Sequence, residues 1–383
     1  MILQELCSLL QLATGKQACL SHALSSDEWK CVYDLARKQA LLGIVFEGVK
    51  RLPQEQWPNG DIVLNWMMAS EAIKRRNRQT TEVCRHLIAE LSKDGFDTCI
   101  LKGQANHDYY NRLDADASLG MLRVCGDVDA WIWPREKTRY PVKAVVDYCR
   151  RKNVLVSLCH LHAEVKPVGG VPVEIHLRPS FLNAPWRDRC FQQLFRSARM
   201  EIREIDGCAA VKKLRVDYDL VFQMAHIYRH LLDEGVGMRQ ILDFYVLWKA
   251  YLKERQERPE LMSIGQLMEQ IRNCGMERFA SALMFVLQEM FGLSEDELLC
   301  AASVKHGSFL LDELVAAGNF GHYDKRMGDL PVKKGRLTYQ LQKAQRRFGR
   351  NLRFLTSYPE EVVCEPWARV YHFLWRKLSL YRL

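Results

Sequence analysis

The stretch VCGDVDAWIW, residues 124–133, is the part of this 383-residue sequence that decides the fold. It alternates polar and apolar residues, as a β-strand with one buried face does, because successive side chains point to opposite faces. Asp127 and Asp129 therefore share one face, and Val128 and Ile132 share the other. Adjacent carboxylates repel each other unless a cation lies between them, and Mg²⁺ prefers oxygen ligands. The pair is a candidate Mg²⁺ site; the alternative is two solvated aspartates on a half-exposed strand.

Short apolar segments on both sides predict the other strands of a sheet. Residues 96–101, FDTCIL, lie between two glycines and read as a buried strand. Residues 154–166 and 171–178 predict a hairpin, because a Gly-Gly pair lies between them. A weaker hairpin is predicted over residues 200–214, with an Asp-Gly turn.

Apolar residues recur at helical spacing before and after these strands. The Ser-Ser-Asp cluster at residues 25–27 is typical of a helix start. The C-terminal helical pattern is broken near residues 318–328 and at Pro359. We therefore predict an α+β protein in three regions: a helical region over residues 1–95, a mixed α/β core over 96–215 and a second helical region over 216–383.

The composition is that of an ordinary folded protein, with 48% hydrophobic and 26% charged residues. The 13 cysteines include no CxxC pair, so the sequence carries no compact zinc or disulfide pattern. No segment reads as a secretory signal or as a transmembrane span. We expect a cytoplasmic protein with reduced thiols.

The net charge of +9 is unevenly distributed, because residues 331–358 contain eight Lys or Arg and no Asp or Glu. Such a segment binds RNA, another polyanion, an anionic membrane surface or an acidic partner, or it is simply a solvated helix face. Phe348 and Phe354 are placed to stack on bases if RNA is the partner. The same spacing, with Arg350 and Arg353 among the basic residues, also fits an amphipathic helix that packs on the protein.

The segment VEIHL, residues 173–177, predicts a second strand with two distinct faces. We predict that Glu174 supplies a third carboxylate, either as a metal ligand or as the acceptor of a hydroxyl proton. The alternative is a surface glutamate. His160, His162 and His176 are candidates for metal or acceptor binding, or ordinary histidines of the sheet.

The segment ILKGQ, residues 100–104, predicts a strand, a glycine turn and then a helix from Gln104 to Tyr110. The backbone N–H groups at a helix start bind anions such as a triphosphate. Gly103 permits close approach of the backbone to a phosphate, and Lys102 supplies a point charge. An ordinary turn between a strand and a helix is the alternative.

Taken together, these segments resemble a known superfamily. A strand–Gly–helix turn, a G-D-x-D strand and a later strand with a central Glu are similar to the DNA polymerase β-type nucleotidyltransferases. LKGQANHDYY, RVCGDVDAWI and VPVEIHLRP more closely resemble a poorly characterised bacterial nucleotidyltransferase family. The resemblance covers roughly residues 80–250, with weaker support from GNFGHYDKR at residues 318–326.

The resemblance implies a nucleotidyltransferase-fold core, catalysis with two Mg²⁺ ions, and Asp127, Asp129 and Glu174 as catalytic and metal-binding residues. Arg123 either contacts phosphate or braces the strand of the aspartates. Arg239 either forms an intrahelical ion pair with the residue four positions later, Asp243, or contacts the nucleotide. The nucleotide contacts that we predict are Lys102, Gly103, Gln104, Arg123, Gly126 and Arg239.

The chain departs from the superfamily at two places. Gln104 follows Gly103, where the superfamily usually has Ser or Gly, so no hydroxyl is available there to grip the phosphates. The interval from Gly103 to Asp127 is also long, and we predict a substrate-facing loop over residues 111–122.

The leading hypothesis is a Mg²⁺-dependent enzyme that moves an NMP group from an NTP to a hydroxyl of a small molecule, an RNA or a protein. One alternative is a non-catalytic protein of the same fold that binds a nucleotide or RNA. Another is a toxin or defence component that inactivates its target by nucleotidylation. A fold supports many functions, so the resemblance does not identify the acceptor.

Overall fold

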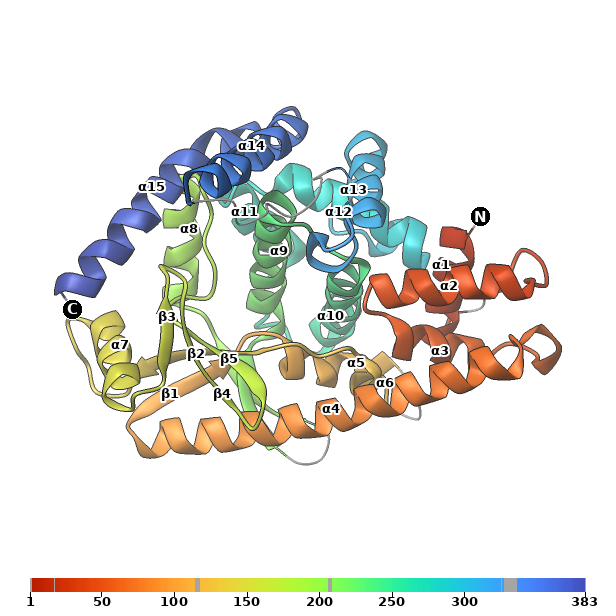
Figure 1. Cartoon of the computed structure of the whole chain (residues 1–383), viewed down its shortest axis with the longest axis horizontal. Coiled ribbons are helices and arrows are strands. Elements are labelled where there is room, and N and C mark those ends of the chain that lie inside the picture. Colours follow the sequence, from red (N-terminus) through yellow and green to blue (C-terminus); the bar gives the residue numbers. More distant parts are fainter. Residues whose placement is uncertain are drawn as a thin grey trace.

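The computed structural model describes residues 2–16, 18–113, 118–205, 209–324, 326 and 336–382. It confirms the predicted α+β class: along the chain, helices precede and follow the strands of a mixed sheet (Figure 1). Four α-helices and a 3₁₀ turn precede the sheet: α1 (Ile2–Ala13), α2 (Ser26–Lys38), α3 (Leu42–Lys50), η1 (Gln54–Gln56) and α4 (Gly60–Lys93). The predicted helix start near residue 25 is confirmed, because Ser25 caps α2 and forms a reciprocal capping box with Glu28.

The main sheet has five strands in the order β1-β2-β5-β4-β3. The β2–β5 pair is parallel, and the other neighbours are antiparallel. A separate antiparallel pair, β6–β7, corresponds to the weaker predicted hairpin, whose Asp-Gly turn lies outside the described residues. The strands are β1 (Phe96–Ile100), β2 (Val128–Pro134), β3 (Leu155–Leu158), β4 (His162–Val168), β5 (Val171–His176), β6 (Met200–Ile205) and β7 (Ala209–Leu214).

The prediction of one strand over residues 154–166 is wrong. The segment forms two strands, β3 and β4, joined by a tight turn at residues 159–161. The backbone N–H of Cys159 donates to the carbonyl of His162 over 2.9 Å, which closes this turn. The turn contains no Gly or Pro, and its neighbours are apolar. The whole segment therefore has the pattern of one continuous strand.

Short helices connect the strands, and a larger set follows them. The connecting elements are η2 (Gly103–Asn106), α5 (His107–Leu113), α6 (Leu119–Leu122), α7 (Pro141–Arg151) and α8 (Pro185–Arg196). The C-terminal elements are α9 (Val216–Asp233), α10 (Met238–Glu257), α11 (Ile264–Asn273), α12 (Glu277–Phe291), η3 (Glu295–Glu297), α13 (Val304–Ala317), η4 (Asn319–Gly321), α14 (Arg336–Phe354) and α15 (Pro359–Arg382).

One face of the sheet packs on α4 and α7. Val128 and Ile132 of β2 are buried there, as the alternation of VCGDVDAWIW predicts, together with Leu87 and Leu91 of α4. The side chain of Asn59 caps the first turn of α4, and Gly95 ends the segment with a φ of +88°. Figure 1 shows α4 running beneath both the sheet and the N-terminal helices.

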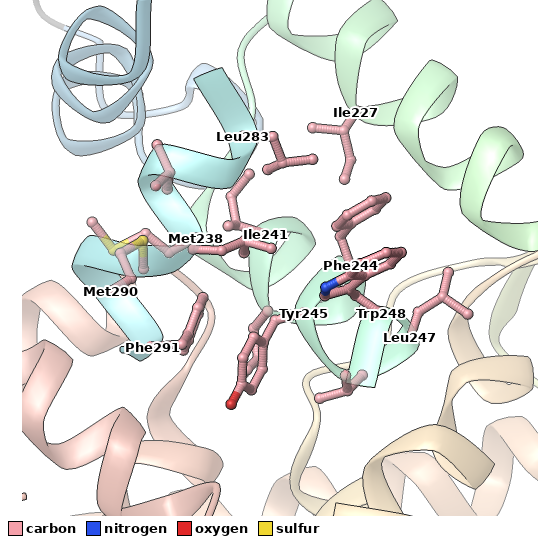
Figure 2. Packing of buried hydrophobic residues seen from close by; sticks show 14 of the residues in the cluster. Ile227, Met238, Ile241, Phe244, Tyr245, Leu247, Trp248, Leu283, Met290 and Phe291 are labelled. Carbon is pink, nitrogen blue, oxygen red and sulfur yellow. The ribbon is translucent and has the colours of Figure 1, made fainter. Parts of the chain in front are cut away.

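A second, larger core joins the N-terminal helices to α9–α13. Figure 2 shows part of it, where Ile241 and Phe244 of α10 gather with Ile227 of α9 and Leu283 of α12. Tyr245 stacks on Phe291 with ring centroids 4.6 Å apart. The two helical regions thus share a hydrophobic core that holds α9 and α10 in fixed positions. The division of the chain into three regions with the predicted boundaries stays a prediction.

Candidate functional site

Three carboxylates meet at the edge of the sheet where β2 and β5 lie side by side. Asp127 lies just before β2, and Asp129 lies within it. Because β2 and β5 pair in parallel with Asp129 opposite Glu174, both side chains lie on one face. One oxygen from each of Asp127, Asp129 and Glu174 can be chosen so that all three lie within 4.8 Å of one another. The structure therefore brings together the three carboxylates singled out from the sequence.

The ammonium group of Lys102 lies between the two aspartates. Its Nζ is 3.3 Å from Asp127 Oδ1 and also contacts Asp129 Oδ2. The side chain of Asp129 is 2% exposed and that of Asp127 is 35% exposed, so Asp129 depends far more on this countercharge. Burial opposes both charged forms, but the mutual attraction raises the pKa of Lys102 and lowers that of Asp129. Lys102 is thus an internal cation for the carboxylate pair.

Two histidines hold the third carboxylate. His176 Nε2 is 2.9 Å from Asp129 Oδ1 and 3.4 Å from Glu174 Oε2. His162 Nδ1 is 3.0 Å from the same oxygen of Glu174. Despite burial, contacts with Cys159 and Glu174 raise the pKa of His162 to about 10. Burial works against the charge of Glu174 too, but the hydrogen bonds from both imidazoles hold its pKa below the usual range.

The register of β4 and β5 explains this arrangement. His162 pairs with His176 across the two strands, which places the two imidazole rings 5.4 Å apart. His160 belongs to a different environment, because its ring stacks on His372 of α15 with centroids 4.3 Å apart. Of the three histidines considered from the sequence, the structure therefore brings two to the carboxylates.

Gly103 shapes the turn after β1. Its φ of +66° lies in the left-handed region, and a Cβ at this position would meet Asp127 O at 3.6 Å. The prediction of one helix from Gln104 to Tyr110 is wrong in its first turn, because the chain there is a 3₁₀ helix, η2, and α5 begins at His107. Tight 3₁₀ turns commonly occur at such connections.

Gln104 is buried and donates through Nε2 to Asn77 Oδ1 on α4 over 3.1 Å. Asn77 in turn donates to the carbonyl groups of Met121 and Arg123, each at 2.8 Å. Asn77 therefore ties the turn after β1 and the loop before Asp127 to the long helix. Sequence reasoning missed Asn77. Its only signal in the sequence is that it is a polar residue within the predicted helix, which does not distinguish it from an exposed residue.

Arg123 forms a buried bidentate pair with Asp243 of α10. Its Nε and Nη2 atoms lie 2.6 and 2.7 Å from the two carboxylate oxygens. Tyr110 also donates to Asp243, over 2.8 Å. Since Asp243 neutralises the charge of Arg123, this geometry favours the bracing alternative for that arginine. The alternative of an Arg239–Asp243 ion pair does not describe the structure: Arg239 instead donates to the carbonyl of Val124 over 2.8 Å.

A cleft opens beside the carboxylates between the turn after β1, the loop before β2, and helices α9 and α10. Of the predicted nucleotide contacts, Gln104 is not among its lining residues. Of the three carboxylates, Asp127 lines the cleft, whereas Asp129 and Glu174 do not. Sequence reasoning missed Phe320, although it lies in the GNFGHYDKR segment, of which Lys325 lies outside the described residues. The lining residues are Lys102, Gly103, Arg123, Gly126, Asp127, Gln223, His226, Ile227, Arg239, Gln240, Asp243 and Phe320.

The basic segment 331–358 begins outside the described residues and continues as α14. Arg350 is 2% exposed and donates to the carbonyl of Leu232 over 3.1 Å, and Phe354 is fully buried. Phe348 is 66% exposed. The packing alternative thus describes Arg350 and Phe354, and RNA binding by the rest of the segment stays a prediction. The prediction of a loop over residues 111–122 is wrong in its described part, because residues 111–113 belong to α5 and residues 119–122 form α6. Positions 114–117 lie outside the described residues.

Among the described helices, none combines the length and apolar character needed to cross a membrane.

Comparison with known proteins identifies a family to which most of the chain corresponds. Residues 25–292 match the model of a family described as uncharacterised nucleotidyltransferase. This range contains the three carboxylates of the site together with Lys102, Arg123 and Arg239, and it ends before Phe320. No curated protein matches the chain. A solved nucleotidyltransferase-like protein from Paracoccidioides brasiliensis, described as antigenic, is similar at 17% identity, over 47% of this chain and 77% of that chain, with a TM-score of 0.29.

Proposed function

Because this chain belongs to the family of uncharacterised nucleotidyltransferases, we propose that it is a Mg²⁺-dependent enzyme that transfers an NMP group from an NTP to a hydroxyl of an acceptor. The observation that carries the proposal is the group formed by Asp127, Asp129 and Glu174, in which one oxygen of each lies within 4.8 Å of the others, and of which Asp127 lines the cleft.

The donor set fits Mg²⁺. Its three members offer only carboxylate oxygens, which are the ligands that this ion prefers. The side chain of Asp127 is 35% exposed, so an ion held there would be accessible to water and to substrate. When bound, Mg²⁺ supplies positive charge to the phosphate oxygens at the transferred group. The ammonium group of Lys102 lies beside both aspartates, which supports the proposal that this pair attracts positive charge.

The charge state of Glu174 favours one of its two candidate roles. A general base works best when its pKa lies near the working pH. His162 and His176 hold the pKa of Glu174 below that of an ordinary glutamate, which makes it a weak proton acceptor. Because both imidazoles also contact the same oxygen of Glu174, at 3.0 and 3.4 Å, we propose that Glu174 binds metal and orients the site, rather than removing the proton of the acceptor hydroxyl.

The rest of the site positions these groups. His176 fixes Asp129 through the 2.9 Å contact, and the Arg123–Asp243 pair fixes the loop that carries Asp127. In phosphoryl transfer the protein contributes mainly by positioning and by stabilising charge, so this bracing is part of the proposed mechanism.

One observation favours a second candidate, a non-catalytic nucleotide-binding protein. Gln104 replaces the small residue that usually follows the glycine, and its buried side chain is committed to Asn77. The turn after β1 therefore offers the phosphates no side-chain hydroxyl at this position.

The transfer reaction separates the two candidates. The full chain is incubated with each of the four NTPs labelled at the α-phosphate, with Mg²⁺ and with separate pools of small metabolites, RNA and protein. We expect label to enter one pool with the natural chain and with Asp296→Asn, an exposed control, and not with Asp127→Asn. Binding of an NTP without transfer to any pool would favour the non-catalytic candidate, and equal transfer by Asp127→Asn would contradict the assigned site.

A further inference from the structure

The wall of the cleft formed by the first turn of α10 has chemistry that the carboxylates do not use. This helix has 20 residues, begins at Met238 after the cap residue Gly237, and presents Arg239 and Gln240 to the cleft. The N-terminus of a helix carries partial positive charge and favours anions. The cleft thus has Asp127 and Lys102 on one side and, on the α10 side, Arg239 and Gln240, with the charge of Asp243 taken up by Arg123.

Two buried donors on this wall have no acceptor among the described residues. They are Nε of Arg239, a residue 7% exposed, and Nε2 of Gln240, a residue 5% exposed. Another atom of each side chain is engaged: Arg239 Nη1 donates to Val124 O, and Gln240 Oε1 accepts from the N–H of Gly237. A buried donor without an acceptor is destabilising, because it has lost its hydrogen bonds to water. Since both unmatched atoms are donors, a ligand that offers only acceptor oxygens completes the wall.

Charge favours the same ligand. Asp243 neutralises Arg123 through the bidentate pair, whereas Arg239 donates to a neutral carbonyl. Burial and the neighbouring charge of Arg123 lower the pKa of Arg239, and the attraction of Asp243 and Asp127 only partly opposes this.

The backbone around Phe320 closes this wall. Phe320 adopts a φ of +53°, between Gly318 at +63° and Gly321 at +68°. A Cβ on Gly321 would lie 1.9 Å from the carbonyl oxygen of Glu234, so glycine is required there. The ring of Phe320 lies with its centroid 5.4 Å from the Arg239 guanidinium. A left-handed backbone is strained for a non-glycine residue, and such strain clusters at ligand clamps. The position of the ring is consistent with a role in fixing the guanidinium for a ligand.

We propose that the first turn of α10, through Arg239 and Gln240, is the subsite that binds the oligophosphate tail of the nucleotide. The inference rests on the proposed function for the identity of the nucleotide, and it locates the phosphates on α10 rather than on the turn at Gly103. Lys102 lines the same cleft but contacts Asp127 and Asp129. In this proposal the oligophosphate tail therefore lies at α10, and the phosphate nearest the nucleoside lies near the aspartates.

Metal-free binding of an oligophosphate tests the subsite separately from catalysis. Calorimetry of the full chain in EDTA uses sodium tripolyphosphate as the probe and a nucleoside monophosphate as the comparison. We expect the natural chain to bind tripolyphosphate more tightly than the monophosphate. We expect Arg239→Gln to bind tripolyphosphate at least tenfold more weakly than the natural chain does. Arg135→Gln, which removes an exposed arginine, is the matched control and should bind as the natural chain does.

A second variant guards against loss of folding. Gln240→Glu keeps an acceptor for the N–H of Gly237 and replaces the unmatched donor by a carboxylate oxygen. It should melt near the temperature of the natural chain and lose tripolyphosphate binding at least tenfold. Unchanged binding in both folded variants, or no binding by the natural chain, would overturn the subsite.

The same titrations distinguish this subsite from the proposed function. Asp127→Asn should keep or strengthen tripolyphosphate binding in EDTA, because it removes a negative charge from the cleft; loss of that binding would contradict the location on α10. If tripolyphosphate binds as predicted but no NTP shows Mg²⁺-dependent binding or transfer, the subsite stands and the nucleotidyltransferase proposal fails.

Discussion

Lys102 points its ammonium group at Asp127, with 3.3 Å between Nζ and Oδ1, and the same group contacts buried Asp129. The chain therefore carries its own cation at the pair of carboxylates proposed to bind Mg²⁺. This arrangement stabilises the charged pair in the absence of metal, and it makes the stability of the metal-free chain depend on Lys102.

Replacing Lys102 by Met should destabilise the metal-free chain. Removing one partner of a buried ion pair leaves uncompensated charge and costs about 3–5 kcal/mol. Mg²⁺ should restore more stability to Lys102→Met than to the natural chain, because the ion supplies the missing positive charge. Thermal unfolding with EDTA and with Mg²⁺ measures both effects.

The matched control is Lys74→Met, which breaks the exposed contact with Glu71. A surface pair of this kind contributes about 0–1 kcal/mol. Equal losses in the two variants would show that Lys102 does not compensate the aspartates.

Gly103→Ala should destabilise the chain by about 1–2 kcal/mol, the usual cost of the left-handed conformation for a residue with a Cβ. The φ of +66° supplies this strain, because a Cβ at Gly103 finds an ordinary contact at 3.6 Å and no clash. Gly126→Ala lies at the same site, where a Cβ meets nothing within 4 Å, and should change stability by much less. Chemical denaturation measures the difference, which would vanish if the backbone at Gly103 were relaxed.

The Arg123–Asp243 pair should show strong coupling in a double-mutant cycle. Arg123→Gln and Asp243→Asn should each cost about 3–5 kcal/mol, and the double variant clearly less than the sum, because each single change leaves a buried charge alone. The exposed Arg135–Asp97 contact, 3.2 Å long, provides the control cycle and should couple by less than about 1 kcal/mol. Additive losses at Arg123 and Asp243 would contradict the bracing role.

His160 should make the fold sensitive to acid. Burial, with the charge of Arg178 nearby, lowers the pKa of His160 to about 2, and its stacking partner His372 is lowered to about 4. A base whose folded-state pKa is depressed stays neutral in the fold while the unfolded chain takes up a proton below about pH 6.5. Stability is therefore fully present above that pH and falls as the pH drops toward 4, by about 2 kcal/mol for His160 alone at about pH 5.

His160→Phe keeps an aromatic ring against His372 and Trp375 but removes the titrating group. Unfolding free energies measured between about pH 7.5 and 5 should fall less in this variant than in the natural chain. Replacement of the exposed His86 by Gln should leave the original pH profile. If the unfolding free energy of His160→Phe fell with pH as much as that of the natural chain, a group other than His160 would be responsible for the acid sensitivity.

Local pattern was sufficient for the strands that carry the carboxylates. Strict alternation in β2 and β5 predicted which side chains enter the core, and the parallel register then brought Asp129 opposite Glu174. The β3–β4 turn escaped prediction because it lacks Gly and Pro. The first turn after Gly103 is 3₁₀, a detail that depends on hydrogen bonds and not on apolar spacing.

Contacts between distant segments could not be predicted from one sequence. Asn77 meets Gln104 because α4 passes beneath the turn, and Asp243 meets Arg123 because the large hydrophobic core holds α10 in place. Phe320 reaches the cleft only through left-handed backbone at η4. The sequence also assigned Lys102 to the phosphates, and the fold adds its contact with the aspartates.

Mg²⁺-dependent NTP binding tests the central claim most directly. Calorimetry compares each NTP in Mg²⁺ and in EDTA, with the natural chain, Asp127→Asn and the exposed control Asp296→Asn, after melting curves establish that all three are folded. We predict that Mg²⁺ tightens binding of an NTP at least tenfold in the natural chain and the control, and that this tightening disappears in Asp127→Asn. An NTP affinity that Mg²⁺ does not change, or a Mg²⁺ effect that survives in Asp127→Asn, would contradict a metal-dependent nucleotidyltransferase site at these carboxylates.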